Sequence, residues 1–341
     1  MIRQPLVSIL IPAYNAEQFI AQTLRSALDQ TWPRKEIIVV DDGSKDGTLA
    51  VARQFASDTV TVVSQPNSGA SVARNKAFSV SRGDFIQWLD ADDLLAPDKI
   101  TTQMAAITRD NNARHLHSGA WGSFFYRFDK TEFIPTPLWE NLSPVEWLFR
   151  KLDQNLFMQT ATWLVSRELT EAAGPWDNRI SYDDDGEYFA RVVRASSGIR
   201  FVPDSRVLYR LSGAGTLSYI GRNNKKLESL LLSMQRHIET LRSMEDSPRV
   251  HAACVKYLQR NLIYYYPQRL DLVEKLNALA ATVGGKLETP ALSWKYNWLR
   301  PILGWDFAKR AQDALPRFKG SLFRSWDRLL YSFQKPRPQN I

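Results

Sequence analysis

Short apolar runs alternate with segments of helical spacing over the first 100 residues of the chain. The runs LVSILIPAY, EIIVVDDGS, VTVVSQ and GDFIQWLDADD are largely apolar on successive positions, which is typical of strands buried on both faces of a sheet. Between them, residues 17–30, 46–56 and 69–81 have the apolar spacing of helices. Strand–helix alternation with short loops predicts an α/β fold with a mostly parallel central sheet flanked by helices.

The pattern changes beyond residue 115. Residues 115–215 mix aromatic, strand-like pieces with loops, and the chain is predominantly helical from about residue 222. Residues 284–305 are rich in Gly, Pro and Trp, which predicts an irregular segment. We therefore predict two parts: an α/β domain over residues 1–215 and a mainly helical, basic and aromatic region over residues 216–341.

The composition is that of a globular protein with a substantial core, because 44% of the residues are apolar and 23% are charged. The single cysteine, Cys254, excludes an intramolecular disulfide and fits a reducing compartment such as the cytoplasm. No apolar run approaches the ~18 to 20 residues that span a bilayer. The N-terminal apolar stretch lacks a charged leader and a cleavage site, so we expect no signal peptide.

Charge is divided unevenly between the two predicted parts. Residues 1–215 hold 23 Lys and Arg against 26 Asp and Glu, whereas residues 216–341 hold 21 against 10. The basic C-terminal part predicts a polyanionic partner, either nucleic acid or an anionic membrane surface.

Polar side chains stand where the predicted strands end: Asn15, Asp41 with Asp42, Asn67, and Asp90 with Asp92. The carboxyl ends of parallel strands meet at one edge of a sheet, and ligands bind outside that edge. The sequence therefore predicts a ligand site built from these residues.

The segment VVDDGSKDGT allows two interpretations. Its Asp and Ser residues can cap the following helix, or Asp41 or Asp42 can accept hydrogen bonds from a base or ribose. Neither a Gly-x-Gly-x-x-Gly nor a Walker-type loop is present, so the phosphates of a nucleotide need another counter-charge.

Asp90-Ala91-Asp92 could supply that counter-charge by holding a cation. In an extended chain both carboxylates point to the same side. Mg²⁺ and Mn²⁺ prefer oxygen ligands and often take only one or two carboxylates plus substrate phosphates. The alternative is that Asp92 or Asp93 caps a helix beginning near Pro97.

The motifs VSILIPAYN, EIIVVDDGSKDGT, QPNSGASVARNKA and GDFIQWLDADD, in this order and spacing, resemble the family 2 glycosyltransferases over residues 5–212. The resemblance implies a Rossmann-like GT-A fold, inverting chemistry, a nucleotide-diphosphate sugar as donor (a UDP-sugar first among the candidates) and Mn²⁺ or Mg²⁺ as cofactor. The positions that it assigns to the donor are Pro12, Ala13, Tyr14, Asn15, Asp41, Asp42, Asn67, Gly69, Arg74, Asp90 and Ala91. It assigns the metal to Asp92, with Asp90 beside it. Arg74 would engage the diphosphate or the sugar hydroxyls; its alternative role is a solvated helix residue.

A later segment, GPWDNRISYDDDGEYFARVVRA, resembles the acceptor-side signature of the same family. Aligned in that way, Asp185 falls on the catalytic base, with Asp184 beside it. An inverting transfer needs a base to deprotonate the attacking hydroxyl, and repulsion from Asp183 and Asp184 is expected to raise the pKa of Asp185. The alternative is an acidic helix N-terminus that favours the helix dipole.

Histidine is missing where many relatives have it. Tyr209-Arg210 is followed by Leu-Ser-Gly rather than by a His that supports the metal or diphosphate, so Arg210 is a candidate to supply charge. His115 and His117 alternate on a predicted strand, and we expect a structural role for them rather than metal binding.

The C-terminal segment KGSLFRSWDRLLYSF places six large apolar residues on one helical face: Leu322, Phe323, Trp326, Leu329, Leu330 and Phe333. Such a helix can lie in a membrane interface or pack on the α/β domain. No nucleic-acid-binding module accompanies the basic residues, which argues against nucleic acid.

The sequence thus predicts a metal-dependent inverting glycosyltransferase acting on a glycan or lipid-linked acceptor in polysaccharide or glycolipid biosynthesis. Its expected setting is the cytoplasm, at the inner face of the membrane. A donor-binding protein without catalysis is the alternative. A nucleotidyltransferase is a weaker one, because PAYNAEQ lacks a Gly-rich loop followed by a basic residue.

Overall fold

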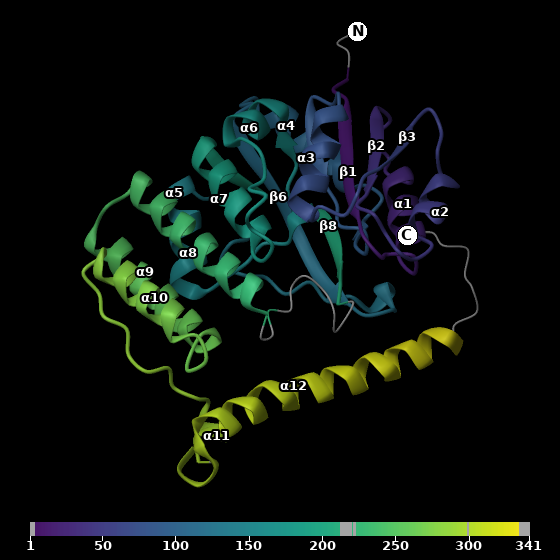
Figure 1. The fold of residues 1–341 in the computed structure, drawn as a ribbon. Helices are drawn as coiled ribbons and strands as arrows, with labels where there is room; N and C mark the ends of the chain where they lie inside the picture. The colour runs from purple at the N-terminus through teal and green to yellow at the C-terminus, as the bar shows by residue number, and fades with distance from the viewer. Residues whose placement is uncertain (1–3, 212–219, 221–222, 299, 334–341) are drawn as a thin grey trace.

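The computed structural model describes residues 4–211, 220, 223–298 and 300–333 (Figure 1). Its centre is a five-stranded sheet in the order β3-β2-β1-β4-β7. Four of its strands run parallel, and the fifth adds an antiparallel edge: β1 (Val7–Ala13), β2 (Lys35–Asp41), β3 (Val60–Ser64), β4 (Phe85–Trp88) and the edge strand β7 (Val165–Ser166). The predicted α/β fold with a mostly parallel sheet is confirmed.

Helices cover both faces of this sheet: α1 (Ile20–Leu28), α2 (Thr48–Arg53), α3 (Ala70–Val80) and α4 (Lys99–Asp110). Side chains of β1 alternate between two hydrophobic clusters. Ile9 packs in one cluster with Leu24 of α1, and Leu10 packs in the other with Ala73 of α3. Because both faces are covered, β1 is apolar on successive positions.

A second sheet of three strands has the order β5-β8-β6. Its strands are β5 (Leu94–Leu95), β6 (His115–Phe124) and β8 (Gly198–Arg210). Three helices and two 3₁₀ turns lie between β6 and β8: Phe128–Lys130, α5 (Pro144–Gln154), Thr160–Thr162, α6 (Arg167–Ala173) and α7 (Asp184–Ala195). Since Leu94 pairs with Leu208, the end of β8 lies beside the acidic turn that follows β4.

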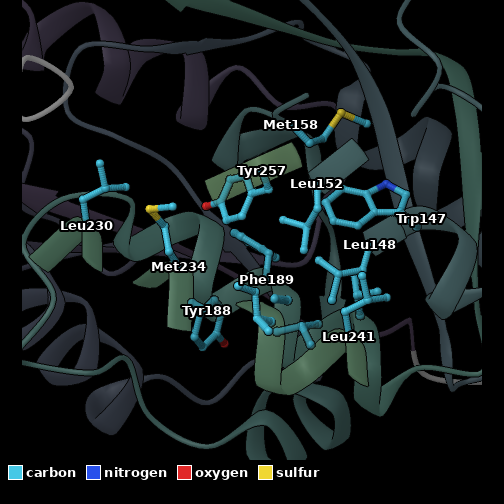
Figure 2. Close-up of a cluster of buried hydrophobic side chains, with 14 of the residues drawn as sticks. Trp147, Leu148, Leu152, Met158, Tyr188, Phe189, Leu230, Met234, Leu241 and Tyr257 are labelled. Atoms are coloured by element: carbon cyan, nitrogen blue, oxygen red, sulfur yellow. The ribbon is translucent and has the colours of Figure 1, made fainter. Parts of the chain in front are cut away.

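The next part of the chain is helical, as predicted: α8 (Asn224–Met244), α9 (Pro248–Asn261), the 3₁₀ turn Leu262–Tyr264 and α10 (Leu270–Ala281). Helices α8 and α9 pack on α5 and α7. Figure 2 shows their shared core, in which Trp147 of α5, Tyr188 of α7, Met234 of α8 and Tyr257 of α9 belong to one cluster. The predicted boundary at residue 215 falls within residues 212–219, outside the described residues.

Two further helices, α11 (Trp294–Asn297) and α12 (Arg300–Phe333), follow and run along one side of the molecule (Figure 1). The irregular segment predicted for residues 284–305 is therefore wrong over its second half. Pro301 stands in the first turn of α12, where a proline is tolerated because its missing N–H needs no partner. Gly304, with φ of 79°, interrupts the helical conformation. Within the described ranges, no helix combines the length and apolarity needed to cross a bilayer.

Candidate active site

The sequence-predicted polar residues meet at the carboxyl edge of the main sheet. Ala13 at the end of β1 pairs with Asp41 at the end of β2, and Asp41 pairs with Ser64 at the end of β3. On the other side of β1, Leu10 pairs with Trp88, so the turn with Asp90 leaves the sheet at the same edge. The fold therefore brings the four predicted strand-end motifs together.

Asp41 and Asp42 have different surroundings, although both are buried. Asp42 accepts hydrogen bonds from Gln65 Nε2 (2.8 Å) and from the backbone N–H groups of Ser68 (2.9 Å) and Gly69 (2.8 Å). Asp41 Oδ2 has only long contacts with Ser44 N and Ser64 Oγ, and no donor among the described residues reaches its buried Oδ1. Asp42 thus holds the loop at residues 65–69, while one buried oxygen of Asp41 has no donor among the described residues.

The interpretation that this acidic segment caps a helix holds for Asp46 but not for Asp41 or Asp42. Helix α2 begins at Thr48 behind Gly47, which has no side chain to cap it. The carboxylate that bonds the first turn is Asp46, whose Oδ1 accepts from Thr48 N at 3.0 Å. Asp41 and Asp42 therefore have no capping role.

Residues after β1 and β3 form the rim of the site. Asn15, with φ of 48°, donates from its backbone N to Ser44 Oγ (3.0 Å) and accepts from Lys45 N (2.8 Å). Tyr14 beside it is exposed, Pro12 is half-buried and Ala13 is buried. Asn67 Nδ2 donates to Asp42 O at 3.0 Å, and Gly69, with φ of 96°, precedes α3 with open space where a Cβ would stand.

Arg74 of α3 lies at the centre of the site. Its side chain is buried, donates to Asp90 Oδ1 at 2.8 Å and to Asp184 Oδ2 at 2.6 Å, and lies 4.4 Å from the ring centre of Trp176. Burial alone would lower the pKa of Arg74, but Asp184 and Asp90 raise it above its ordinary value. The solvated-helix interpretation of Arg74 is wrong. The arginine instead joins two acidic motifs 94 residues apart in the chain, Asp90 and Asp184.

The acidic turn after β4 is fixed by the end of β8. Asp93 is fully buried and accepts from Arg210 N (2.8 Å) and Gln159 Nε2 (2.6 Å). Burial, followed by repulsion from Asp92 and Asp90, raises the pKa of Asp93 well above its usual range. Helix α4 begins behind Asp98, so neither Asp92 nor Asp93 caps it, and the capping interpretation is wrong here too.

Arg210 is the basic group at this turn. Its Nε donates to the backbone oxygen of Asp92 at 2.7 Å, and its guanidinium carbon lies 4.9 Å from the ring centre of Phe19 and 4.5 Å from that of Phe124. Of the three residues that follow Arg210 in place of the expected histidine, Leu211 is exposed, and Ser212 and Gly213 lie outside the described residues. Asp92 is partly exposed beside buried Ala91. Across the described part of the chain, no group of three or more His, Cys, Asp or Glu side chains could hold a metal by itself.

The acidic run at the start of α7 divides into three environments. Asp183, in the left-handed conformation (φ 60°), accepts from Ser233 Oγ of α8 at 2.5 Å, and Asp184 bonds Arg74. Asp185 accepts from Thr160 Oγ1 at 3.2 Å. Burial, and then repulsion from Asp184 and Asp183, raises the pKa of Asp185 to about 7, while Arg74 opposes the rise. The predicted direction is confirmed, but burial is the larger cause.

His115 and His117 lie at the start of β6, paired with the start of β8, whereas the site is at the end of β8. His115 Nδ1 lies 2.6 Å from Asp110 Oδ2. Burial lowers the pKa of His117 to about 4. His117 Nε2 lies 3.3 Å from the same Asp110 oxygen, so both histidines contact one carboxylate at the end of the strand away from the site.

Sequence reasoning missed several groups that support the site: Gln159, Thr160, Trp176 and Ser233. Trp176 belongs to the GPWD motif that was recognised, but its contact with Arg74 gave no separate signal. The other three carry no local pattern, because their partners lie on distant elements.

Comparison with known proteins gives one family. The family described as glycosyl transferase family 2 matches residues 8–174. A protein named as the teichuronic acid biosynthesis glycosyltransferase TuaG of Bacillus subtilis is 43% identical over 104 residues, 30% of this chain and 41% of its own. EpsJ of the same organism, an uncharacterized glycosyltransferase, is 28% identical over 214 residues (60% and 61%). Chondroitin synthase of Escherichia coli is 40% identical over 110 residues (32% and 16%). The chain thus spans less than two thirds of the length of these three relatives.

Among solved structures, residues 1–349 of Staphylococcus aureus TarS in complex with UDP superpose with a TM-score of 0.63 at 17% identity, covering 97% of this chain and 93% of that one. The same part of TarS in complex with UDP-GlcNAc gives a TM-score of 0.57 at 17% identity, with the same coverage. These likenesses establish the fold.

Proposed function

Because residues 8–174 form a glycosyltransferase family 2 domain on a GT-A fold, we propose that the protein transfers a sugar, with inversion, from a nucleotide-diphosphate sugar to an acceptor hydroxyl. The observation that carries the proposal is the bridge made by Arg74. It joins Asp90, from the motif assigned to the donor, to Asp184, from the motif assigned to the acceptor. Asp185, with a pKa of about 7, is the next residue along.

The nucleotide would bind at the ends of β1 and β2. The unpartnered Oδ1 of Asp41 is buried, and a buried acceptor without a donor costs free energy that a bound N–H group would recover. The N–H of a uracil ring is such a donor, and Tyr14 offers an exposed ring beside it. The TarS complexes with UDP and UDP-GlcNAc support a UDP-sugar as the first donor to test.

The residues at the acidic turn fit a divalent cation held together with the donor. They offer oxygen ligands only, and Mg²⁺ or Mn²⁺ commonly uses one or two carboxylates plus substrate phosphates. Asp92 is partly exposed at this turn, and we assign the cation to it, with Asp90 as the second ligand. When bound, the cation would offset negative charge on the leaving diphosphate. Arg210 and Arg74 keep the turn and its neighbouring carboxylates in place.

Asp185 would act as the base. As the acceptor oxygen bonds to the anomeric carbon, its proton passes to Asp185, and the bond to the nucleotide diphosphate breaks with its electrons leaving on the diphosphate. A base with a pKa near 7 is matched to neutral pH. Asp184 pairs with Arg74 and Asp183 accepts from Ser233, whereas the pKa of Asp185 is raised to about 7, so we assign Asp185 as the base of this run.

Substitution of the base tests this assignment. Asp185→Asn keeps the size and the Thr160 contact but cannot take a proton, so transfer should fall at least 100-fold, while donor binding stays within threefold. Asp58→Asn, an exposed acid on the same domain, is the matched control and should keep its activity. Transfer by Asp185→Asn at the wild-type rate would exclude Asp185 as the base.

A donor panel tests the rest of the proposal. UDP-, GDP- and dTDP-sugars would be scored for binding and for hydrolysis, with and without Mn²⁺. We expect one nucleotide to bind best and Mn²⁺ to strengthen its binding through Asp92. Binding of every donor to the same extent without metal would contradict the metal assignment, and binding without any turnover would favour the non-catalytic alternative.

The remaining parts of the proposed function are the acceptor substrate and the cellular location of the reaction. The names of TuaG and chondroitin synthase refer to polysaccharide products, which supports a glycan or lipid-linked acceptor in polysaccharide or glycolipid biosynthesis. We place the reaction in the cytoplasm at the inner face of a membrane.

A further inference from the structure

Helix α12 exposes apolar side chains along one face. Six of them are between 46% and 76% exposed: Leu315, Phe318, Leu322, Trp326, Leu329 and Phe333. They follow one another at intervals of three or four residues, so they form one stripe along the helix. We call these six residues the apolar stripe. An exposed apolar surface of this kind marks an interaction site in a folded protein.

The polar side of the same helix already contacts the rest of the protein. Asp327 accepts from Arg127 Nε at 2.6 Å and from Tyr126 N at 2.8 Å. One turn further on, the ring of Tyr331 lies 6.2 Å from that of Tyr126. Helical spacing puts Asp327 and Tyr331 on the side of α12 away from the apolar stripe. The helix therefore packs on the protein through its polar side and directs the stripe outward.

The charge around the stripe favours an anionic surface. Residues 300–333 contain seven Lys and Arg against three Asp. Exposed Lys319 and Arg328 belong to this set. Two copies of the helix would bring like charges together. Anionic lipid headgroups would attract both flanks while the stripe enters the acyl boundary. On α11 and just beyond it, Trp294 and Trp298 are also exposed, and tryptophan favours membrane interfaces.

We propose that the apolar stripe of α12 docks on an anionic lipid bilayer, with the helix lying in the plane of the interface. The docking helix also reaches the candidate active site. The Tyr331 hydroxyl lies 3.5 Å from Gln22 Nε2, and Gln22 Oε1 accepts from Arg210, which bonds the backbone of Asp92. A bilayer on α12 would hold a lipid-linked acceptor near the carboxyl edge of the sheet. That last step rests on the proposed function, whereas the docking itself does not.

Vesicle binding of the full chain tests the docking surface without any donor or acceptor. Partition coefficients would be measured by co-sedimentation with vesicles of phosphatidylcholine alone and of phosphatidylcholine with 30% phosphatidylglycerol. Leu322→Gln with Trp326→Gln removes two members of the stripe. Ser321→Gln with Ser325→Gln is the matched control, because it places the same residue at two exposed, polar positions of the same turns. All four positions are exposed, so equal unfolding temperatures would show that the fold is kept.

We expect the wild type and the control to bind anionic vesicles at least tenfold more tightly than neutral ones, and the stripe variant to lose at least tenfold. Equal partitioning of the stripe variant and the control would overturn the proposal. Sedimentation velocity tests the alternative that a second copy of the chain, rather than a bilayer, covers the stripe. A dimer that the stripe variant abolishes, without vesicle binding by the wild type, would assign the stripe to a second copy instead. Vesicle binding with no glycosyl transfer would support the docking surface and contradict the proposed function.

Discussion

Asp42 accepts three hydrogen bonds from the loop at residues 65–69, whereas its neighbour Asp41 keeps one buried oxygen without a donor among the described residues. Similarly, Asp93 is held by Arg210 N and Gln159. The sequence predicts carboxylates at strand ends because strand and turn patterns are local. It cannot predict which member of a pair is structural, because the donors come from elements far along the chain.

At the residue scale, the first prediction concerns the substitution of Arg74. Lysine in its place can reach one carboxylate but not bridge Asp90 and Asp184, and one partly buried acid would lose its partner. We expect Arg74→Lys to lower kcat/KM by roughly 100-fold and the free energy of unfolding by about 2 kcal/mol.

Steady-state kinetics and urea unfolding check this. Arg82→Lys is the control, because Arg82 is 80% exposed in its ion pair with Glu36. That exposed pair should contribute little. An Arg74→Lys variant that behaves like the control would contradict the bridging role.

The pKa of Asp185 predicts two pH effects. With a pKa of about 7, the base is ionised above neutrality, so kcat/KM should reach a plateau above pH 8 and fall about tenfold from there by pH 6. A carboxyl whose pKa is raised on folding binds its proton more tightly in the folded state than in the unfolded chain. Ionisation therefore costs stability as pH rises from about 4 to 7.

Asp185→Asn removes that cost. It should raise the free energy of unfolding at pH 8 by at least about 1 kcal/mol, and by little at pH 4. Chemical denaturation at the two pH values measures this. A variant that is less stable at pH 8 than the wild type would mean that the pKa of Asp185 is not raised.

At the scale of elements, α8 shapes the start of α7. Ser229 accepts hydrogen bonds from the backbone N–H groups of Ser181 and Tyr182, and Ser233 donates to the carboxylate of Asp183. These contacts fix the turn at residues 181–183, which positions Asp184 and Asp185. The sequence predicts α8 as a helix, but its two serines look like ordinary helix residues until the tertiary packing is known.

We expect Ser233→Ala to lower kcat roughly tenfold and to shift the midpoint of the pH profile, because Asp183 is one of the charges that raise the pKa of Asp185. A merely structural serine would lower stability without moving that midpoint. Ser243→Ala, at an exposed position of the same helix, should change neither quantity.

The other elements show where sequence patterns suffice. The buried strands and α1 to α3 follow directly from apolar periodicity, because each is covered by its neighbours in the chain. The prediction for the start of α12 was wrong, because Pro301 and Gly304 are residues that usually break helices. Pro301 occupies the first turn of α12, and Gly304 forms an interruption that the helix tolerates.

At the scale of the whole molecule, the α/β part and α8 to α10 share a core. The cluster that contains Leu10 of β1 and Trp147 of α5 continues through Met234 of α8 to Leu258 of α9. The charge asymmetry of the sequence indicated two parts, but it carries no information on how tightly they pack.

Truncation tests this shared core. A chain ending at residue 211 should fail to give a cooperative unfolding transition, because buried faces of α5 and α7 would be left uncovered. A chain ending at residue 298 keeps α8 to α10 and should unfold cooperatively. Calorimetry measures the unfolding transition of each chain. A cooperative transition for the chain of residues 1–211 would show that the α/β part folds without α8 to α10.

The configuration of the released sugar shows whether the proposed glycosyl transfer proceeds with inversion. An α-linked UDP-sugar that the protein accepts would be followed by ¹H NMR during transfer, or during hydrolysis when water is the acceptor. A single attack assisted by Asp185 predicts a β-configured product at early times. An α-configured product would exclude an inverting transfer.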